Sequence, residues 1–245
     1  MNRLAQFGAV FLLATANSLA QVTVETVFEH EQYLASEPLR VGIRITNFSG
    51  QTLRMGDTPD WLDLLIESER GELALQNSPP PIIEPFEIPS SSRATRWVDL
   101  VPHFEVGRIG QYKVTPTVRV ADLGQEVIGK AATVSITGGA RIWEQEFGVR
   151  CIGGDAPGAL EVRRYALIQA MNQKRVALYV RVADQADVRV FGVLPVGPVL
   201  AFSRPEAQVD GASQLHVLSQ TSARLFTYCV VSPNGELTVR QLHRY

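Results

Sequence analysis

The chain has 245 residues, 45% of them hydrophobic, which is enough to bury one large core or two ordinary ones and excludes a wholly disordered protein. Its formal net charge is -2, and no basic run stands out, so the chain has no electrostatic footprint for nucleic acid or anionic lipid. Beyond the first residues, no segment approaches the ~20 apolar residues that a membrane-spanning helix requires, so no integral membrane segment is expected.

The first twenty residues have the pattern of a secretory signal peptide. Asn2-Arg3 forms a short positive region, 7–14 is apolar, and Ser18-Leu19-Ala20 places small residues where a signal peptidase reads them. We therefore predict that residues 1–20 are removed after Ala20 and that the mature chain is exported to the periplasm or the cell exterior. The alternative is an N-terminal core strand or helix of a cytosolic protein.

Residues 21–137 have the pattern of several short strands. Leu39, Val41, Ile43 and Ile45 alternate with Arg40, Gly42, Arg44 and Thr46. This period of two is typical of a half-buried antiparallel strand. Later, Tyr112, Val114, Val118 and Val120 alternate in the same way, and three consecutive prolines (79–81) interrupt the pattern between these runs. About seven such strands predict a β-sandwich.

The runs Tyr33–Asn47 and Gly110–Val114 resemble early and late strands of immunoglobulin-like domains of bacterial exported proteins. The resemblance covers residues 21–137. It implies that Tyr112 occupies the place of a corner tyrosine. It also places Val114 where antibody domains have a cysteine, so the inter-sheet disulfide of those domains is missing here.

Residues 161–245 contain an internal repeat, preceded by a linker and lead-in strand at 138–160. Runs starting at Leu178 and Leu215 align at an offset of 37, and the strands 188–194 and 225–231 keep that offset. Each is followed by a Pro/Gly segment, for which we predict turns at 195–197 and 233–235. Units of this length are typical of propeller blades.

The second unit resembles the blades of sialidase-type Asp-box propellers through Val209-Asp210 and Ser232-Pro233-Asn234-Gly235, with Asn234 at an aspartate position. The first unit lacks the box, and two blades cannot close a ring. The pair therefore forms two stacked sheets, a second sandwich or half of a ring completed by a partner, unless the similarity is due to chance. The predicted fold class is all-β: an immunoglobulin-like sandwich followed by two blade-like antiparallel meanders.

No pattern of residues predicts a catalytic, cofactor or metal site. The four histidines do not share a ligand spacing. Asp60 and Asp63 could serve as a carboxylate pair, but Asp63 alternates with Leu62 and Leu64 as the solvent face of a strand. We name no catalytic residue, no cofactor-binding residue and no metal ligand. In an oxidising compartment, Cys151 and Cys229 can form a disulfide, and the alternative is two buried free thiols.

These observations favour a non-enzymatic exported module that binds another protein or organises an assembly. Its expected partner is another protein or a second copy of the chain, bound through the C-terminal domain, where we expect Leu242 and Tyr245 to be covered in the functional state. An accessory protein that binds carbohydrate or peptide is the alternative, in which Trp61, Trp97 or Trp143 stacks on a sugar. A hydrolase or protease inhibitor is a third class.

Overall fold

The computed structural model describes residues 21–79, 84–150, 160–172 and 175–245. The predicted signal peptide lies outside these residues. The prediction of an all-β fold is confirmed, because apart from two single-turn 3-10 helices, Pro59–Trp61 and Ala121–Leu123, the described elements are strands. The strands are β1 (Val22–Phe28), β2 (Gln32–Leu34), β3 (Arg40–Asn47), β4 (Leu53–Met55), β5 (Leu62–Ser68), β6 (Phe86–Ile88), β7 (Arg93–Asp99), β8 (Gly110–Val120), β9 (Gln125–Ile128), β10 (Ala132–Thr137), β11 (Ala140–Arg150), β12 (Leu160–Asn172), β13 (Arg175–Asp184), β14 (Val190–Pro198), β15 (Glu206–Val209), β16 (Leu215–Ser222), β17 (Leu225–Val231) and β18 (Leu237–Arg244).

The first ten strands build a sandwich of two main sheets. One sheet has the order β1-β3-β7, and the other has the order β2-β10-β8-β5, with β9 added to β8. β2 runs parallel to β10, whereas the other pairs in these two sheets are antiparallel. A short third sheet pairs β4 with β6.

The core of this sandwich comes from the alternating runs recognised in the sequence. Val41, Ile43 and Ile45 of β3 are fully buried and face Val114 and Val118 of β8 within one apolar cluster. At the start of β8, the hydroxyl of Tyr112 donates a hydrogen bond to the backbone oxygen of Arg108, 3.1 Å away. This bond joins the strand to the loop that precedes it.

The remaining eight strands form two four-stranded antiparallel meanders, which we call the middle sheet (β11-β12-β13-β14) and the terminal sheet (β15-β16-β17-β18). They pack face to face over one apolar cluster that includes Leu178, Val180, Leu215 and Val217. Leu178 of β13 and Leu215 of β16, which begin the two aligned runs, are both fully buried in it. Of the arrangements that the repeat allowed, the structure has two stacked sheets.

The prediction of a turn at 195–197 is wrong. Pro195 and Gly197 lie inside β14, which is an edge strand that pairs only with β13 in the middle sheet. A proline cannot donate a ladder hydrogen bond, but an edge strand tolerates it because one side of its backbone has no neighbour. The fourth strand of the middle sheet is β11, which precedes the aligned run that begins at Leu178. The predicted turn at 233–235 does join β17 to β18.

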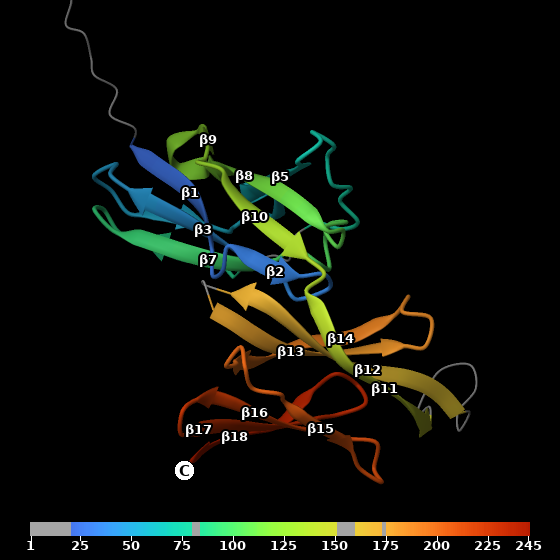
Figure 1. Cartoon of the computed structure of the whole chain (residues 1–245). Helices are drawn as coiled ribbons and strands as arrows, with labels where there is room; N and C mark the ends of the chain where they lie inside the picture. Colours follow the sequence, from blue (N-terminus) through green and yellow to red (C-terminus); the bar gives the residue numbers. More distant parts are fainter. Residues whose placement is uncertain (1–20, 80–83, 151–159, 173–174) are drawn as a thin grey trace, which may run out of the picture.

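The middle sheet is buried on both faces and lies between the sandwich and the terminal sheet (Figure 1). On the face toward the sandwich, Leu34 of β2 packs against Ile168 of β12 and Tyr179 of β13. Gly139 joins the two halves with φ +64°, and a Cβ there would lie 2.5 Å from Cγ2 of Ile168. The contact is therefore close-packed, and a larger residue at 139 would force the halves apart.

Two side chains of β12 form hydrogen bonds from the middle sheet to the terminal sheet and its turns. Tyr165 is fully buried, stacks on Phe147 at 4.2 Å, and directs its hydroxyl at the backbone oxygens of Ser213 (3.0 Å) and Val231 (3.1 Å). Arg163 is buried beside it and donates to the oxygen of Pro233 (2.8 Å) and to Oδ1 of Asn234 (2.9 Å).

Candidate functional site

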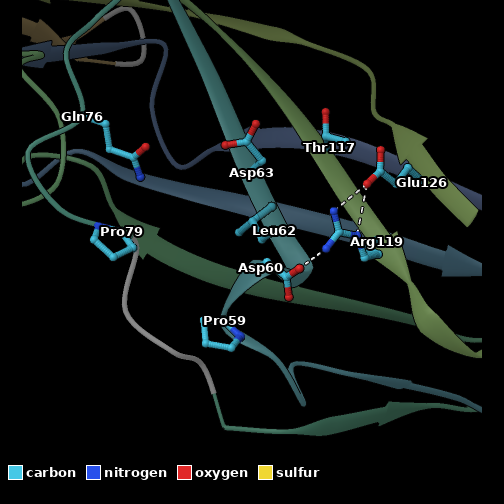
Figure 2. A pocket seen from close by; sticks show the side chains of 9 residues that line it. All are labelled: Pro59, Asp60, Leu62, Asp63, Gln76, Pro79, Thr117, Arg119 and Glu126. Carbon is cyan, nitrogen blue, oxygen red and sulfur yellow. Dashed lines mark hydrogen bonds and ion pairs between the residues drawn. The ribbon is translucent and has the colours of Figure 1, made fainter.

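A group of polar side chains in the N-terminal sandwich lies around Arg119 of β8, in an open hollow of about 450 Å³ (Figure 2). The Arg119 guanidinium contacts the carboxylate of Asp60 and donates to Oε1 of Glu126 from Nε (3.1 Å) and Nη2 (2.8 Å). About half of each of these side chains is exposed to solvent. Ion pairs this exposed contribute only about 0–1 kcal/mol, so the group is weak evidence for function.

Asp60 and Asp63, the two carboxylates considered in the sequence, lie in different surroundings. Asp60 is paired with Arg119, whereas Asp63 lies on the solvent face of β5, opposite Thr117 of β8. The two carboxylates line the same hollow, and both are exposed.

Cys229 lies in the core between the middle and terminal sheets and is fully buried. Burial raises the pKa of its thiol, so it is a poor nucleophile. Cys151 lies outside the described residues, and the disulfide between the two stays a prediction.

The three tryptophans occupy different environments. Trp61 is a core residue, and Trp143 packs against the cluster between the middle and terminal sheets. Trp97 lies on the outer side of β7 with 37% of its surface exposed, and its ring covers Gly42, where a Cβ would come within 3.1 Å of it. Trp97 is therefore the tryptophan whose ring is open to a ligand.

A relay of three polar side chains crosses the outer side of the terminal sheet. His216 of β16 contacts Asp210 Oδ2 through Nε2 (3.0 Å) and the Tyr228 hydroxyl through Nδ1 (2.6 Å). Because a carboxylate can only accept, in the neutral imidazole Nε2 carries the proton and Nδ1 accepts from the phenol. The hydrogen bond from His216 is the main reason that the pKa of Asp210 is lowered. Asp210 also accepts from the backbone of Ala212 and Gln214, which fixes its position.

Acid, imidazole and hydroxyl follow one another in the order of a nucleophile triad, in a setting that is open to solvent. About a third of the His216 and Asp210 side chains is exposed, so water reaches the relay. Catalytic stabilisation of charge depends on a site that excludes water. The relay instead holds the Tyr228 ring in one orientation on the sheet surface.

The face around Tyr228, which we call the outer face, has aromatic, amide and imidazole groups. Tyr228 lies opposite Leu218 and Gln241, and Phe226 lies opposite Gln220 and His243. In the strands β16–β18, the side chains on this face include no lysine or arginine. Its residues are His216, Leu218, Gln220, Phe226, Tyr228, Val230, Val239, Gln241 and His243.

The terminal sheet ends in an exposed strand, β18. It pairs with β17 and has no neighbour on its other edge among the described strands. None of its side chains belongs to a described apolar cluster, in contrast to the other edge strands β11, β14 and β15. Leu242 is 65% exposed and the following Tyr245 is 95% exposed, so within the single chain both residues expected to be covered face solvent.

The inner side of β18, which faces the same way as the core side of β17, has alternating apolar and basic residues. Arg240 lies opposite Cys229, Leu242 opposite Thr227, and Arg244 opposite Leu225. No ion pair with a described acidic residue involves Arg240 or Arg244. All three side chains are exposed, although the Arg240 guanidinium approaches Gly197 of β14, so two cations without a described acidic partner lie on β18.

The sequence did not predict the relay. Asp210, His216 and Tyr228 are brought together by the register of β15, β16 and β17, which a single sequence does not give. The signal that was available was the polar residue His216 in an otherwise alternating apolar run. In the described parts of the chain, no three His, Cys, Asp or Glu side chains are placed to hold a metal ion.

No protein-family model matches the chain, and no curated protein matches it. Among the described residues, no helix has the length and apolar character needed to cross a membrane. Among solved structures, the chain is similar to the sporulation control protein Spo0M from Bacillus subtilis, with 10% sequence identity over 70% of this chain and 83% of that chain. The TM-score is 0.33, a value too low to support an argument about function.

Proposed function

We propose that this chain is an exported, non-enzymatic binding module that engages another protein through the open edge of β18. The observation that carries the proposal is a strand of eight residues with a free edge and exposed side chains on both of its faces. In an antiparallel sheet, alternate residues of an edge strand direct their N–H and C=O groups away from the sheet, where an extended segment of another chain can pair with them.

The N-terminal part fits this proposal as a rigid support. Its strand order, β1-β3-β7 against β2-β10-β8-β5, and the hydrogen bond from Tyr112 to the loop before β8 support an immunoglobulin-like sandwich over residues 21–137. The packing of Leu34 on the middle sheet supports a fixed orientation of this sandwich relative to the binding edge. Such sandwiches serve as scaffolds in many contexts, and function is therefore assigned from the edge and not from the fold.

A photo-crosslinking residue at Gln241 of β18, in the full chain in its native host, tests the proposal. We expect an adduct with a different polypeptide, and we expect the crosslinked segment, added as a synthetic peptide, to slow hydrogen exchange of the β18 amides. The matched control is the same residue at Gln208, which is exposed on β15 at the opposite edge of the terminal sheet. Adducts from Gln208 alone, or peptides that leave β18 exchange unchanged, would contradict the proposal.

A second candidate function, carbohydrate binding, is favoured by the outer face. Neutral sugars are bound in proteins by aromatic rings that stack on them and by side chains that exchange hydrogen bonds with hydroxyl groups. The outer face offers the Tyr228 ring, held by His216, and the amide of Gln241 opposite it. Stacking requires a ring that does not move, and the relay supplies that rigidity.

We expect Tyr228→Ala to weaken binding of a neutral oligosaccharide, measured by calorimetry with a panel of soluble hexasaccharides, by about fivefold or more, since an aromatic contact is worth roughly 1 kcal/mol or above. Trp97→Ala is the matched control, because Trp97 is the exposed tryptophan of the N-terminal sandwich. If Trp97→Ala abolishes binding and Tyr228→Ala does not, the sugar lies on the sandwich. If no oligosaccharide of the panel binds, the second function is wrong.

A further inference from the structure

We propose that the partner strand of β18 is an extended segment in which acidic residues alternate with an apolar residue, and that a second copy of this chain is excluded. This inference rests on the proposed function, since it names the chemistry of the segment that pairs with the edge. The inference follows from the positive charges of Arg240 and Arg244 on the inner side of β18 and from the exposure of two leucines of the same strand, Leu237 and Leu242.

The charges on β18 are all of one sign. The strand contains Arg240 and Arg244 and no acidic residue, whereas Glu236 stands in the turn before it and Arg224 in the turn before β17. Arg224 lies at the same end as Arg244, because the backbone N–H of Tyr245 donates to its oxygen at 3.0 Å. An approaching strand therefore meets a positive edge over the second half of β18.

The same charges disfavour pairing between two copies. If two β18 strands paired antiparallel, Arg240 and Arg244 of one copy would lie within a few residues of the same arginines of the other copy. Inward-pointing charges on an edge strand are a known means of preventing edge-to-edge association, because pairing places like charges together. The arginines of β18 therefore disfavour pairing with a second copy of this chain, and they leave the edge open to a segment of opposite charge.

The inner side also has apolar area for the partner. Leu242 lies between Arg240 and Arg244 on this side, and Leu237 lies at the start of the strand with 37% of its surface exposed. Successive side chains of a paired strand alternate between the two faces, so residues two apart in the partner meet Arg240, Leu242 and Arg244 in turn. The complementary order on that face is acidic, apolar, acidic.

Arg240 reaches toward the middle sheet. Its guanidinium lies close to Gly197 of β14, where a Cβ would come within 3.3 Å of Nη2. The glycine at this position leaves the space in which the arginine lies. The side chain stays exposed, and the planar fork of a guanidinium matches the two oxygens of a carboxylate.

The test uses the chain from Gln21 and two seven-residue peptides, Thr-Glu-Thr-Leu-Thr-Glu-Thr and the same peptide with both glutamates replaced by glutamine. Affinity is measured by fluorescence anisotropy, and hydrogen exchange reports protection of β18. We expect the acidic peptide to bind about tenfold more tightly than the neutral one in low salt, two exposed ion pairs supplying up to ~1 kcal/mol each, and this difference to shrink as salt is raised. In the double variant Arg240→Glu with Arg244→Glu, the preference should disappear or reverse.

A matched control variant, Arg189→Glu with Arg204→Glu, introduces the same change of charge outside β18 and should leave the preference intact. If the two peptides protect β18 equally, the acidic partner is wrong while pairing at the edge stands. If neither peptide protects β18, the proposed function fails as well. A dimer that forms through β18 in sedimentation experiments would also overturn the inference.

Discussion

Replacing Tyr165 with alanine is expected to lower the free energy of unfolding by about 3–5 kcal/mol, the usual cost of removing a buried aromatic ring. The ring is fully buried and stacked on Phe147. Its hydroxyl bonds to backbone oxygens of Ser213 and Val231, which belong to the terminal sheet and its first turn. The substitution therefore opens a cavity and also removes the polar contact between the two C-terminal sheets.

Thermal unfolding of the chain from Gln21, followed by calorimetry, measures this effect. At roughly 2–4 °C per kcal/mol for a chain of this size, the expected fall in Tm is about 6–20 °C. Tyr165→Phe separates the two contributions, because it keeps the ring and leaves the carbonyls without their donor, at a cost of about 1–3 kcal/mol. Tyr245→Ala, at an exposed tyrosine, is the control and should leave Tm unchanged. A Tyr165→Ala protein with the Tm of the parent would refute the packing of the two sheets on each other.

Replacing Arg163 with alanine is expected to cost about 3 kcal/mol or more, in the range found when one partner of a buried ion pair is removed. The guanidinium donates to Pro233, to Asn234 and to Glu161, and it lies 3.8 Å from the centre of the Phe191 ring. It thereby holds the turn between β17 and β18. Loss of this contact should loosen the turn and increase hydrogen exchange in β18.

Arg163→Lys is expected to recover less than half of the loss, because an ammonium group cannot bridge three acceptors and stack on a ring at the same time. The matched control is Arg189→Ala. Arg189 also stacks on Phe191, at 4.7 Å, but it is exposed. If Arg189→Ala and Arg163→Ala destabilise the protein equally, the stacking accounts for the effect and the bonds to the turn do not.

The sequence predicted the strands well where one face of a strand is buried and the other is exposed to solvent. The alternation of Leu39 to Ile45 marks such a strand, and these apolar residues lie in the core of the sandwich. The offset between the runs at Leu178 and Leu215 predicted two comparable meanders, and both residues are in one core. A period-two pattern can be read from the sequence because burial of one face of a strand requires an apolar residue at every second position.

The parts that the sequence did not predict depend on distant contacts. Pro195 suggested a turn, yet it lies in an edge strand, and edge position is a property of the whole sheet. His216 lies beside Asp210 and Tyr228 through the pairing of three strands.

The burial of the middle sheet on both faces has a consequence for the order of folding. Its inner residues, such as Leu178, are covered by the terminal sheet, and its other face, with Ile168 and Tyr179, is covered by the sandwich. Because the chain is synthesised from its N-terminus, the sandwich can fold from its own strands before the later strands are made. The middle sheet then remains with a bare apolar face until the last forty or so residues arrive, because no earlier strand can cover that face. A chain that stalls or is cut before β15 would expose this face, and it should aggregate or be degraded while the complete chain persists.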